Sequence, residues 1–316
     1  MQVSGDQDVP RAHMVTPPPP IGIRITARHA RPARIRLTTM NSVLVTGAAR
    51  GIGKAICLRM AQQGWQVYAG VRKLSDGEAL TAADSRITPV QLDVTNPDDI
   101  AALDAALPAD LTAVVNNAGI VVDGPVELLT LDELRNQFEV NVFGQVAVAQ
   151  AVLPRLRATQ GRVVFISSLS GRISTPGTGA YNASKFALEG LVDALRVELR
   201  PFGIRTSLIE PGPIATDLWF GATDMVDTTT AHLTEAQRTL YSAHLAGLRK
   251  MSQQVPKIAA PVGSVVKEVE KALTAKHPRA RYIPGIAGKV QVVATSLTPT
   301  PILDTLFALV SGIRKK

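Results

Sequence analysis

The chain has 316 residues, of which 46% are hydrophobic and 19% are charged, which allows a buried core and excludes wholesale disorder. Its single cysteine, Cys57, excludes an internal disulfide and clusters held by several thiolates, and the five scattered histidines give no sign of a metal site. The net charge of +8 lies mostly in residues 1–39 and in the last three residues, so the body lacks the basic face of a nucleic-acid-binding protein.

Residues 1–39 have no regular apolar period, and the four prolines at 17–20 favour an extended backbone. We predict a disordered Arg- and Pro-rich extension, or a reading frame whose natural start is Met40. An Arg-rich organelle-targeting leader is the alternative. No later stretch is apolar and long enough to span a membrane, and we expect a cytoplasmic protein.

From Met40 onward, short apolar strands alternate with helices. We predict strands over 42–46, 65–71, 87–93, 112–115, 161–168, 205–210 and 281–284, and helices over 54–63, 98–107, 132–157, 180–200 and 258–276. Strands that are apolar along their whole length and alternate with helices indicate an α/β domain, a single doubly wound, Rossmann-type parallel sheet with helices on both faces. This domain spans residues 40–290, and a helical tail follows over 291–316.

The turn between the first strand and the first helix contains Gly47, Gly51 and Gly53. Glycines at this place let backbone N–H groups approach a pyrophosphate at the positive end of the helix. The spacing is G-x-x-x-G-x-G, which differs from the commoner dinucleotide fingerprint. Within a βαβ unit, it favours a dinucleotide-binding site over an ordinary tight turn.

Tyr181 and Lys185 lie four residues apart on a predicted helix and therefore share one face. A neighbouring ammonium stabilises a phenolate, so this tyrosine is suited to exchange a proton with an alcohol or a carbonyl. A surface tyrosine beside a solvated lysine is the alternative. Ser168 ends a strand thirteen residues upstream, where its hydroxyl is placed to hold the same substrate oxygen; Ser167 is its neighbour and competitor.

Together these motifs resemble those of the short-chain dehydrogenase/reductase family in order and spacing, over about residues 41–217. They are T-G-x-x-x-G-I-G at 46–53, N-N-A-G at 116–119, Asn141, Ser168, Tyr-x-x-x-Lys at 181–185 and Pro211-Gly212. The resemblance implies a catalytic tetrad in which Tyr181 is the general acid or base, Ser168 polarises the carbonyl and Lys185 lowers the tyrosine pKa. Asn141 completes it by kinking its helix and supporting a proton relay to Lys185.

The same resemblance implies a nicotinamide dinucleotide and the residues that contact it. The second strand ends at Arg72 with no acid before Asp76, and Arg50 lies in the glycine turn, so we favour NADP(H) over NAD(H). The predicted cofactor-binding residues are Gly47, Arg50, Gly51, Ile52, Gly53, Arg72, Asp93, Val94, Asn116, Ala118, Gly119, Tyr181, Lys185, Pro211, Gly212, Ile214 and Thr216.

Residues 213–256 form an apolar stretch that corresponds to the family's substrate lid. Its large side chains favour a small lipophilic carbonyl or alcohol substrate, such as a steroid, retinoid or acyl chain, as in the hydroxysteroid- and retinol-dehydrogenase-like branch. The alternative is that they only pack the lid onto the core. They are Leu218, Trp219, Phe220, Met225, Leu233, Leu240, Tyr241, Leu245, Leu248 and Met251.

We therefore predict an NADP(H)-dependent oxidoreductase acting on CH–OH groups. A non-catalytic dinucleotide sensor or scaffold on the same fold is the alternative, although a pure binder has no need of the tyrosine–lysine pair. A nucleotide-sugar epimerase shares that pair but usually has another glycine spacing. The apolar residues 302–313, followed by Arg314-Lys315-Lys316, suggest peripheral membrane contact or packing on a partner subunit in a homodimer or homotetramer.

Overall fold

The computed structural model describes residues 40–216 and 231–313. Several sequence predictions therefore lie outside the described residues. These are the extension over 1–39, the lid residues Leu218, Trp219, Phe220 and Met225, and the basic end Arg314-Lys315-Lys316.

A seven-stranded sheet in the order β3-β2-β1-β4-β5-β6-β7 forms the centre of the described chain, and every pairing in it is parallel. The order reverses between β1 and β4, as in a doubly wound sheet. The predicted fold class is therefore confirmed. The strands are β1 (Ser42–Thr46), β2 (Gln66–Val71), β3 (Ile87–Gln91), β4 (Ala113–Asn116), β5 (Arg162–Ile166), β6 (Arg205–Ile209) and β7 (Arg281–Tyr282).

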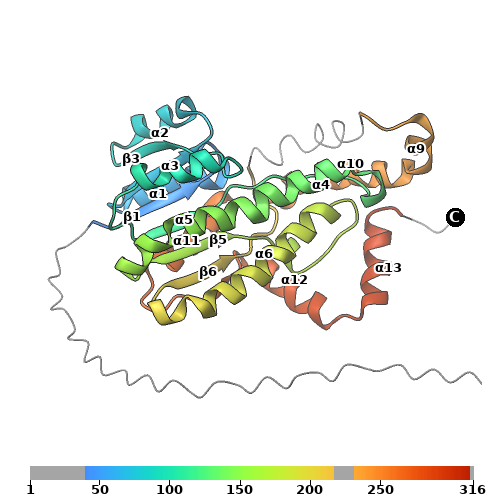
Figure 1. Cartoon of the computed structure of the whole chain (residues 1–316). Coiled ribbons are helices and arrows are strands. Elements are labelled where there is room, and N and C mark those ends of the chain that lie inside the picture. Colours follow the sequence, from blue (N-terminus) through green and yellow to red (C-terminus); the bar gives the residue numbers. More distant parts are fainter. Residues whose placement is uncertain (1–39, 217–230, 314–316) are drawn as a thin grey trace, which may run out of the picture. The chain divides into compact units, whose positions relative to one another are not determined.

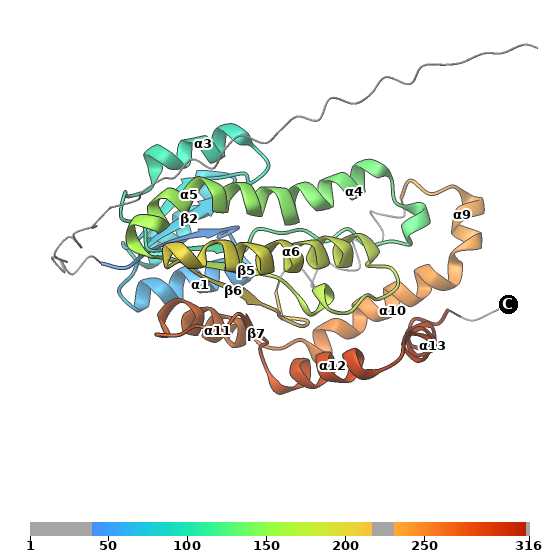
Figure 2. The same ribbon diagram turned by 60° about the horizontal axis from the view of Figure 1, so that its bottom comes forward.

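Helices cover both faces of the sheet (Figures 1 and 2). One face packs on α1 (Gly51–Gln62), α2 (Glu78–Ala83) and α11 (Val262–Thr274), and the other on α3 (Pro97–Ala106), α5 (Gln145–Thr159) and α6 (Gly179–Glu198). A hydrophobic core lies on each face of the sheet, and the side chains of β1 alternate between them. Val43 and Val45 pack on the face covered by α1, and Leu44 packs on the face covered by α5. Cys57 is buried on α1, and burial raises the pKa of its thiol to about 12.

The helical region predicted over 132–157 is interrupted. Helix α4 (Leu131–Phe138) runs into a π-helical turn over Glu139–Gly144, and α5 follows directly. Gly144 belongs to this turn, and a Cβ there would lie 2.6 Å from the backbone oxygen of Val94. The turn thus lets the helix pass close to the chain that follows β3.

After β6, the lid region contains helices that the sequence analysis did not predict, and the first helix of the tail begins before residue 291. The lid region contains α9 (Glu235–Leu240) and α10 (Ser242–Ile258), and the tail forms α12 (Ile286–Leu297) and α13 (Thr300–Val310). The helix predicted over 258–276 begins later, as α11, because Pro261 disfavours a helical residue before it and caps the new helix. Among the described residues, no helix is long and apolar enough to cross a membrane.

Four short 3₁₀ turns complete the described secondary structure: Leu74–Gly77 after β2, Val126–Leu128 before α4, Leu169–Gly171 after β5 and Arg200–Phe202 after α6. The Leu169–Gly171 turn matters most for the site, because Ser168 is its N-cap and accepts a hydrogen bond from the Ser170 N–H at 3.1 Å.

Candidate active site

A cavity of about 930 Å³ opens at the carboxyl ends of the strands, where the strand order reverses. Its walls come from the chain segments that follow β1, β2, β3, β4, β5 and β6, and from α10 on the side away from the sheet. Gln291 of α12 and Val310 of α13 also reach its lining. One cavity therefore combines the strand ends with the C-terminal helices.

Most of the residues predicted from the sequence meet in this cavity. Those that line it are Gly47, Arg50, Gly51, Ile52, Arg72, Asp93, Val94, Ala118, Gly119, Ser168, Tyr181, Lys185, Pro211, Gly212, Ile214 and Thr216. Three predicted residues, Gly53, Asn116 and Asn141, are buried and do not line it. Of the lid residues within the described chain, Leu248 and Met251 line the cavity.

The turn after β1 is an open backbone cradle at the start of α1. Gly47 and Gly51 adopt φ values of 64° and 55°, which favour glycine. A Cβ at Gly53 would lie 2.3 Å from the carbonyl oxygen of Gly47, so this glycine allows the helix to begin directly against the turn. A helix N-terminus that faces a cavity in this way fits a phosphate.

The loop that follows β4 is held by side chains. Thr46 Oγ1 accepts hydrogen bonds from the backbone N–H groups of Asn117 and Ala118, both at 2.9 Å. Asn117 in turn donates its side-chain amide to the carbonyls of Thr46 and Gly47. The end of β1 and the loop after β4 are thereby joined where both line the cavity.

Three buried amide side chains continue this support from the α4–α5 region. Gln137 accepts from the Val122 N–H at 2.7 Å, Asn141 accepts from the Ile120 N–H at 2.8 Å, and Gln145 donates to the Ala118 carbonyl at 2.8 Å. Asn141 also donates to the Ile120 carbonyl and to the Ser184 hydroxyl on α6. The sequence analysis did not identify Gln137 and Gln145. The pattern that could have identified them is their spacing, because they lie four residues before and four residues after Asn141.

Tyr181 lies near the start of α6, and Ser168 lies two residues after the end of β5. Burial raises the pKa of the Tyr181 phenol to about 12, the hydrogen bond with Ser168 lowers it, and the negative charge of Asp123 raises it. The Ser168 hydroxyl also donates to the Pro211 carbonyl at 3.4 Å. A protonated phenol and a hydroxyl thus meet at one end of the cavity.

Lys185 follows Tyr181 by one helical turn, and its Nζ lies 5.7 Å from the centre of the tyrosine ring. The ammonium donates to the Ile166 carbonyl at 2.8 Å, which fixes it against the end of β5. Burial lowers the pKa of Lys185 to about 8, and the nearby Glu189 carboxylate raises it. The lysine is therefore positioned to place a positive charge beside the phenol at neutral pH.

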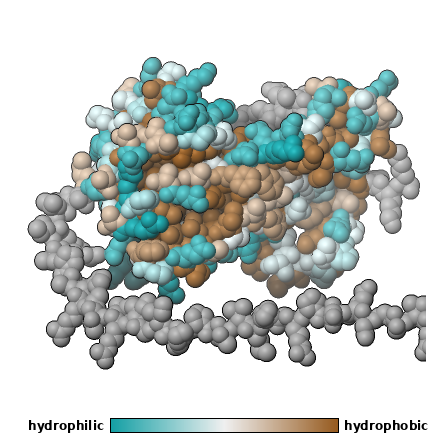
Figure 3. Space-filling view, viewed as in Figure 1, coloured by the Kyte–Doolittle hydropathy of each residue, from teal (hydrophilic) through white to brown (hydrophobic). Residues whose placement is uncertain are grey.

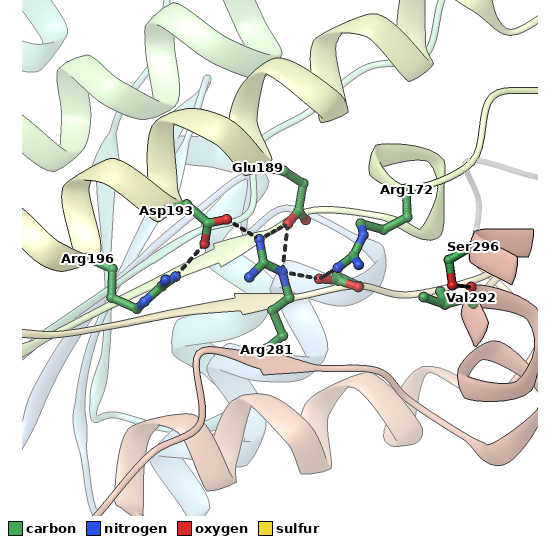
Figure 4. A network of polar contacts seen from close by, with 8 residues as sticks. Arg172, Glu189, Asp193, Arg196, Arg281, Val292 and Ser296 are labelled. Atoms are coloured by element: carbon green, nitrogen blue, oxygen red, sulfur yellow. Dashed lines mark hydrogen bonds and ion pairs between the residues drawn. The ribbon is translucent and has the colours of Figure 1, made fainter.

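A network of charged residues joins α6, β7 and the segment that follows β6 (Figure 4). Arg281 on β7 bridges Glu189 at 3.0 Å and Glu210 at 2.9 Å, and Arg172 lies 3.5 Å from Glu210. Burial, and then the charge of Glu189, raises the pKa of the Glu210 carboxyl to about 7. Glu189 follows Lys185 by one helical turn and Glu210 directly precedes Pro211, so this network ties together two of the cavity walls.

Two acidic residues that the sequence analysis did not assign also line the cavity. Asp76 lies near Arg72, where the chain leaves β2. Asp123 is buried near Tyr181, and burial raises the pKa of its carboxyl to about 6. Neither residue belongs to the motifs that the sequence analysis used.

Comparison with known proteins agrees with this geometry. A family model described as short chain dehydrogenase matches residues 41–227. An NADPH-dependent 3-dehydrocapnine reductase from Ornithobacterium rhinotracheale is 35% identical and the match covers 85% of this chain and 96% of that protein. Human retinol dehydrogenase 5 is 34% identical over 85% of this chain and 88% of its own.

Solved structures resemble the described fold as well. A short chain dehydrogenase from Burkholderia cenocepacia J2315 in complex with NADP has a TM-score of 0.68 and 25% identity, over 84% of this chain and 97% of that chain. The match therefore spans nearly the whole of that protein.

Replacing Thr46 tests how the loop after β4 is supported. Thr46→Val keeps the shape of the side chain but leaves two partly buried N–H groups without their acceptor, which costs about 2 kcal/mol. Thr46→Ser keeps the oxygen and removes one methyl group, which costs about 1 kcal/mol. We expect urea unfolding to rank the wild type above the serine variant and the serine variant above the valine variant; equal stability of the two variants would contradict this support.

Proposed function

Because the chain belongs to the short-chain dehydrogenase/reductase family of oxidoreductases, whose relatives here include retinol dehydrogenases, we propose that it interconverts a lipophilic ketone or aldehyde and the corresponding alcohol with NADP(H). The observation that carries this proposal is the meeting of Tyr181, Ser168 and Lys185 at one end of the cavity, with the glycine cradle at the other.

In the proposed reduction, Tyr181 donates its phenolic proton to the carbonyl oxygen of the substrate, and Ser168 donates a hydrogen bond to the same oxygen. Because the pKa of Tyr181 is raised, its phenol is protonated at neutral pH before the reaction. The Lys185 ammonium stabilises the phenolate that remains. The hydride for the reduction would come from NADPH when it is bound in the glycine cradle.

The proposed role of Asn141 is to position the catalytic residues Tyr181 and Lys185. Its amide holds the Ile120 backbone and the Ser184 hydroxyl, three residues after Tyr181, and it lies inside the π-helical turn. It thereby links the loop after β4 to the helix that carries Tyr181 and Lys185. This support does not require Asn141 to line the cavity.

The cofactor fits the described cradle, and two arginines favour NADP(H). Arg50 and Arg72 are exposed at the cavity and are suited to bind a 2′-phosphate, while Asp93, Val94, Ala118 and Gly119 would hold the adenosine side. Pro211, Gly212, Ile214 and Thr216 would hold the nicotinamide side. One relative is named as NADPH-dependent, and the Burkholderia structure contains NADP. Asp76 at the same rim is the residue that would instead favour NAD(H).

The substrate end of the cavity supports the lipophilic part of the proposal. Val121, Leu169, Ile173, Leu248 and Met251 provide apolar lining to the cavity that Tyr181 also lines. An apolar chain would bury its surface there while its carbonyl reaches the phenol.

Two exposed apolar surfaces support the proposal that the protein contacts a second copy of itself and a lipid surface. Figure 3 shows hydrophobic residues gathered over α5 and α6, where Phe186 and Leu191 are exposed, and we assign this surface to a second copy of the chain. On α12 and α13, exposed apolar side chains follow helical spacing and reach the cavity rim at Val310. Lys289 lies beside them and three basic residues end the chain, so we assign this second surface to lipid contact.

Tyr181→Phe tests the reaction. The ring still packs, but the transferable proton is lost, and we expect turnover of any accepted ketone to fall by roughly 10²–10⁴-fold. NADPH affinity should stay within a few-fold of the wild type. The measurement is NADPH oxidation with a series of lipophilic ketones and aldehydes, and near-normal turnover by the variant would refute the role of Tyr181. A wild type that binds NADPH but turns over no carbonyl compound would favour the sensor alternative.

The pKa of Lys185 predicts the pH dependence of reduction. Because burial lowers this pKa to about 8, the ammonium is present below that pH and is lost above it. We expect kcat/KM for ketone reduction to be steady near neutral pH and to decline above pH of about 8, since the phenolate then lacks its positive neighbour. A profile that continues unchanged well into the alkaline range would contradict this role.

Arg72→Ala tests the choice of cofactor. A charged hydrogen bond to phosphate at an exposed site is reduced by solvent screening, so we expect NADPH to bind about tenfold more weakly and NADH almost unchanged. Lys73→Ala is the matched control, because Lys73 is the exposed neighbour that does not line the cavity. The affinity of each variant for NADPH and for NADH is measured by calorimetric titration. An equal loss of affinity for the two cofactors in Arg72→Ala would refute the assignment of Arg72 to the 2′-phosphate.

A further inference from the structure

The substrate end of the cavity contains a buried carboxylate that the proposed reaction does not use. Asp123 is 7% exposed, and its Oδ1 has no hydrogen-bond partner among the described residues. None of the ion pairs between described residues includes it. Residues 217–230, whose structure is not described, contain no lysine, arginine or histidine.

The backbone holds Asp123 firmly in this place. The preceding residue, Val122, donates its N–H to Gln137, and the following residue, Gly124, donates its N–H to the Gly177 carbonyl at 2.7 Å. Gly124 also pairs with Thr178, just before the helix that carries Tyr181. The carboxylate is therefore fixed at the same end of the cavity as the reacting phenol.

An isolated charge in this place is unfavourable in two ways. A buried carboxylate without a partner loses its hydration and gains no ion pair in return. Its negative charge also raises the pKa of Tyr181, which opposes formation of the phenolate. Val121 and Leu248, which line the same cavity, are apolar and offer no compensation. A cation brought by the substrate would remove both penalties.

We propose that Asp123 binds a protonated amine of the substrate, so that the preferred substrates are lipophilic amino ketones and amino alcohols whose amine lies close to the reacting carbon. The inference rests on the proposed oxidoreductase function and narrows its substrate class. Asp123 forms an ion pair with the ammonium, Tyr181 and Ser168 contact the oxygen, and the apolar lining accepts the hydrocarbon chain. The ammonium also offsets the field that Asp123 exerts on the phenol.

The test compares two long-chain alcohols that differ only in a vicinal amine, oxidised with NADP⁺ by the wild type and by Asp123→Asn. We expect the wild type to prefer the amino alcohol, and the variant to lose about tenfold to a hundredfold in kcat/KM for it, mainly through KM. Oxidation of the plain alkanol should not fall. Asp132→Asn is the matched control, because it makes the same change on an exposed residue outside the cavity.

A binding measurement separates this inference from the proposed function. Calorimetric titration with a long-chain alkylamine should show tighter binding to the wild type than to Asp123→Asn, and an alkanol of the same length should bind both equally. If the amine binds through Asp123 but neither alcohol is oxidised, the proposed function is wrong and the amine site stands. Equal use of both alcohols, or a preference that survives in the variant, would overturn the amine site while the oxidoreductase function stands.

Discussion

The site depends on side-chain hydrogen bonds that hold the loop after β4. A parallel sheet pairs its strands only up to their ends, so backbone groups of a loop beyond that edge need other partners. Thr46, Gln137, Asn141 and Gln145 supply them between Asn117 and Val122. These bonds set where the loop passes along the cavity, and hence where Ala118, Gly119 and Asp123 are presented to a bound molecule.

A second layer of support acts on the reacting residues through charge. Lys185 contacts the Ile166 carbonyl on one side and has Glu189 one turn behind it, and Glu189 is joined through Arg281 to Glu210. Helix α6, strand β7 and the residue that follows β6 thereby share one set of partly buried ionisable groups. Removing one member of such a set leaves its partner with an uncompensated charge, which is destabilising. Because Glu189 follows Lys185 by one helical turn and Glu210 directly precedes Pro211, the network links the positions of Lys185 and Pro211.

The sequence predicted the sheet and the motif residues that meet in the cavity, because both depend on local patterns. Apolar strands, the glycine turn after residue 46 and the Tyr-x-x-x-Lys pair can each be identified within a few positions. Contacts between distant positions left no such pattern. Arg281 meets Glu189 across 92 positions, and Gln137 supports Val122 through tertiary packing. Helix α10 was missed for the same reason, since it is set by what it packs against, whereas the π-helical turn lies at Asn141, where a kink was expected. Asp123 belongs to no motif, and only its burial in the cavity distinguishes it from a loop aspartate.

The origin of the cavity walls has an evolutionary consequence. The reacting end is built from strand termini that also form the central core, whereas the opposite wall comes from α10, α12 and α13 at the end of the chain. Mutations in the terminal helices can therefore reshape the space for the substrate without disturbing the sheet. Descendants of one ancestral gene are then free to diverge in the substrates they accept while they inherit the same chemistry, with the changes concentrated in α10, α12 and α13.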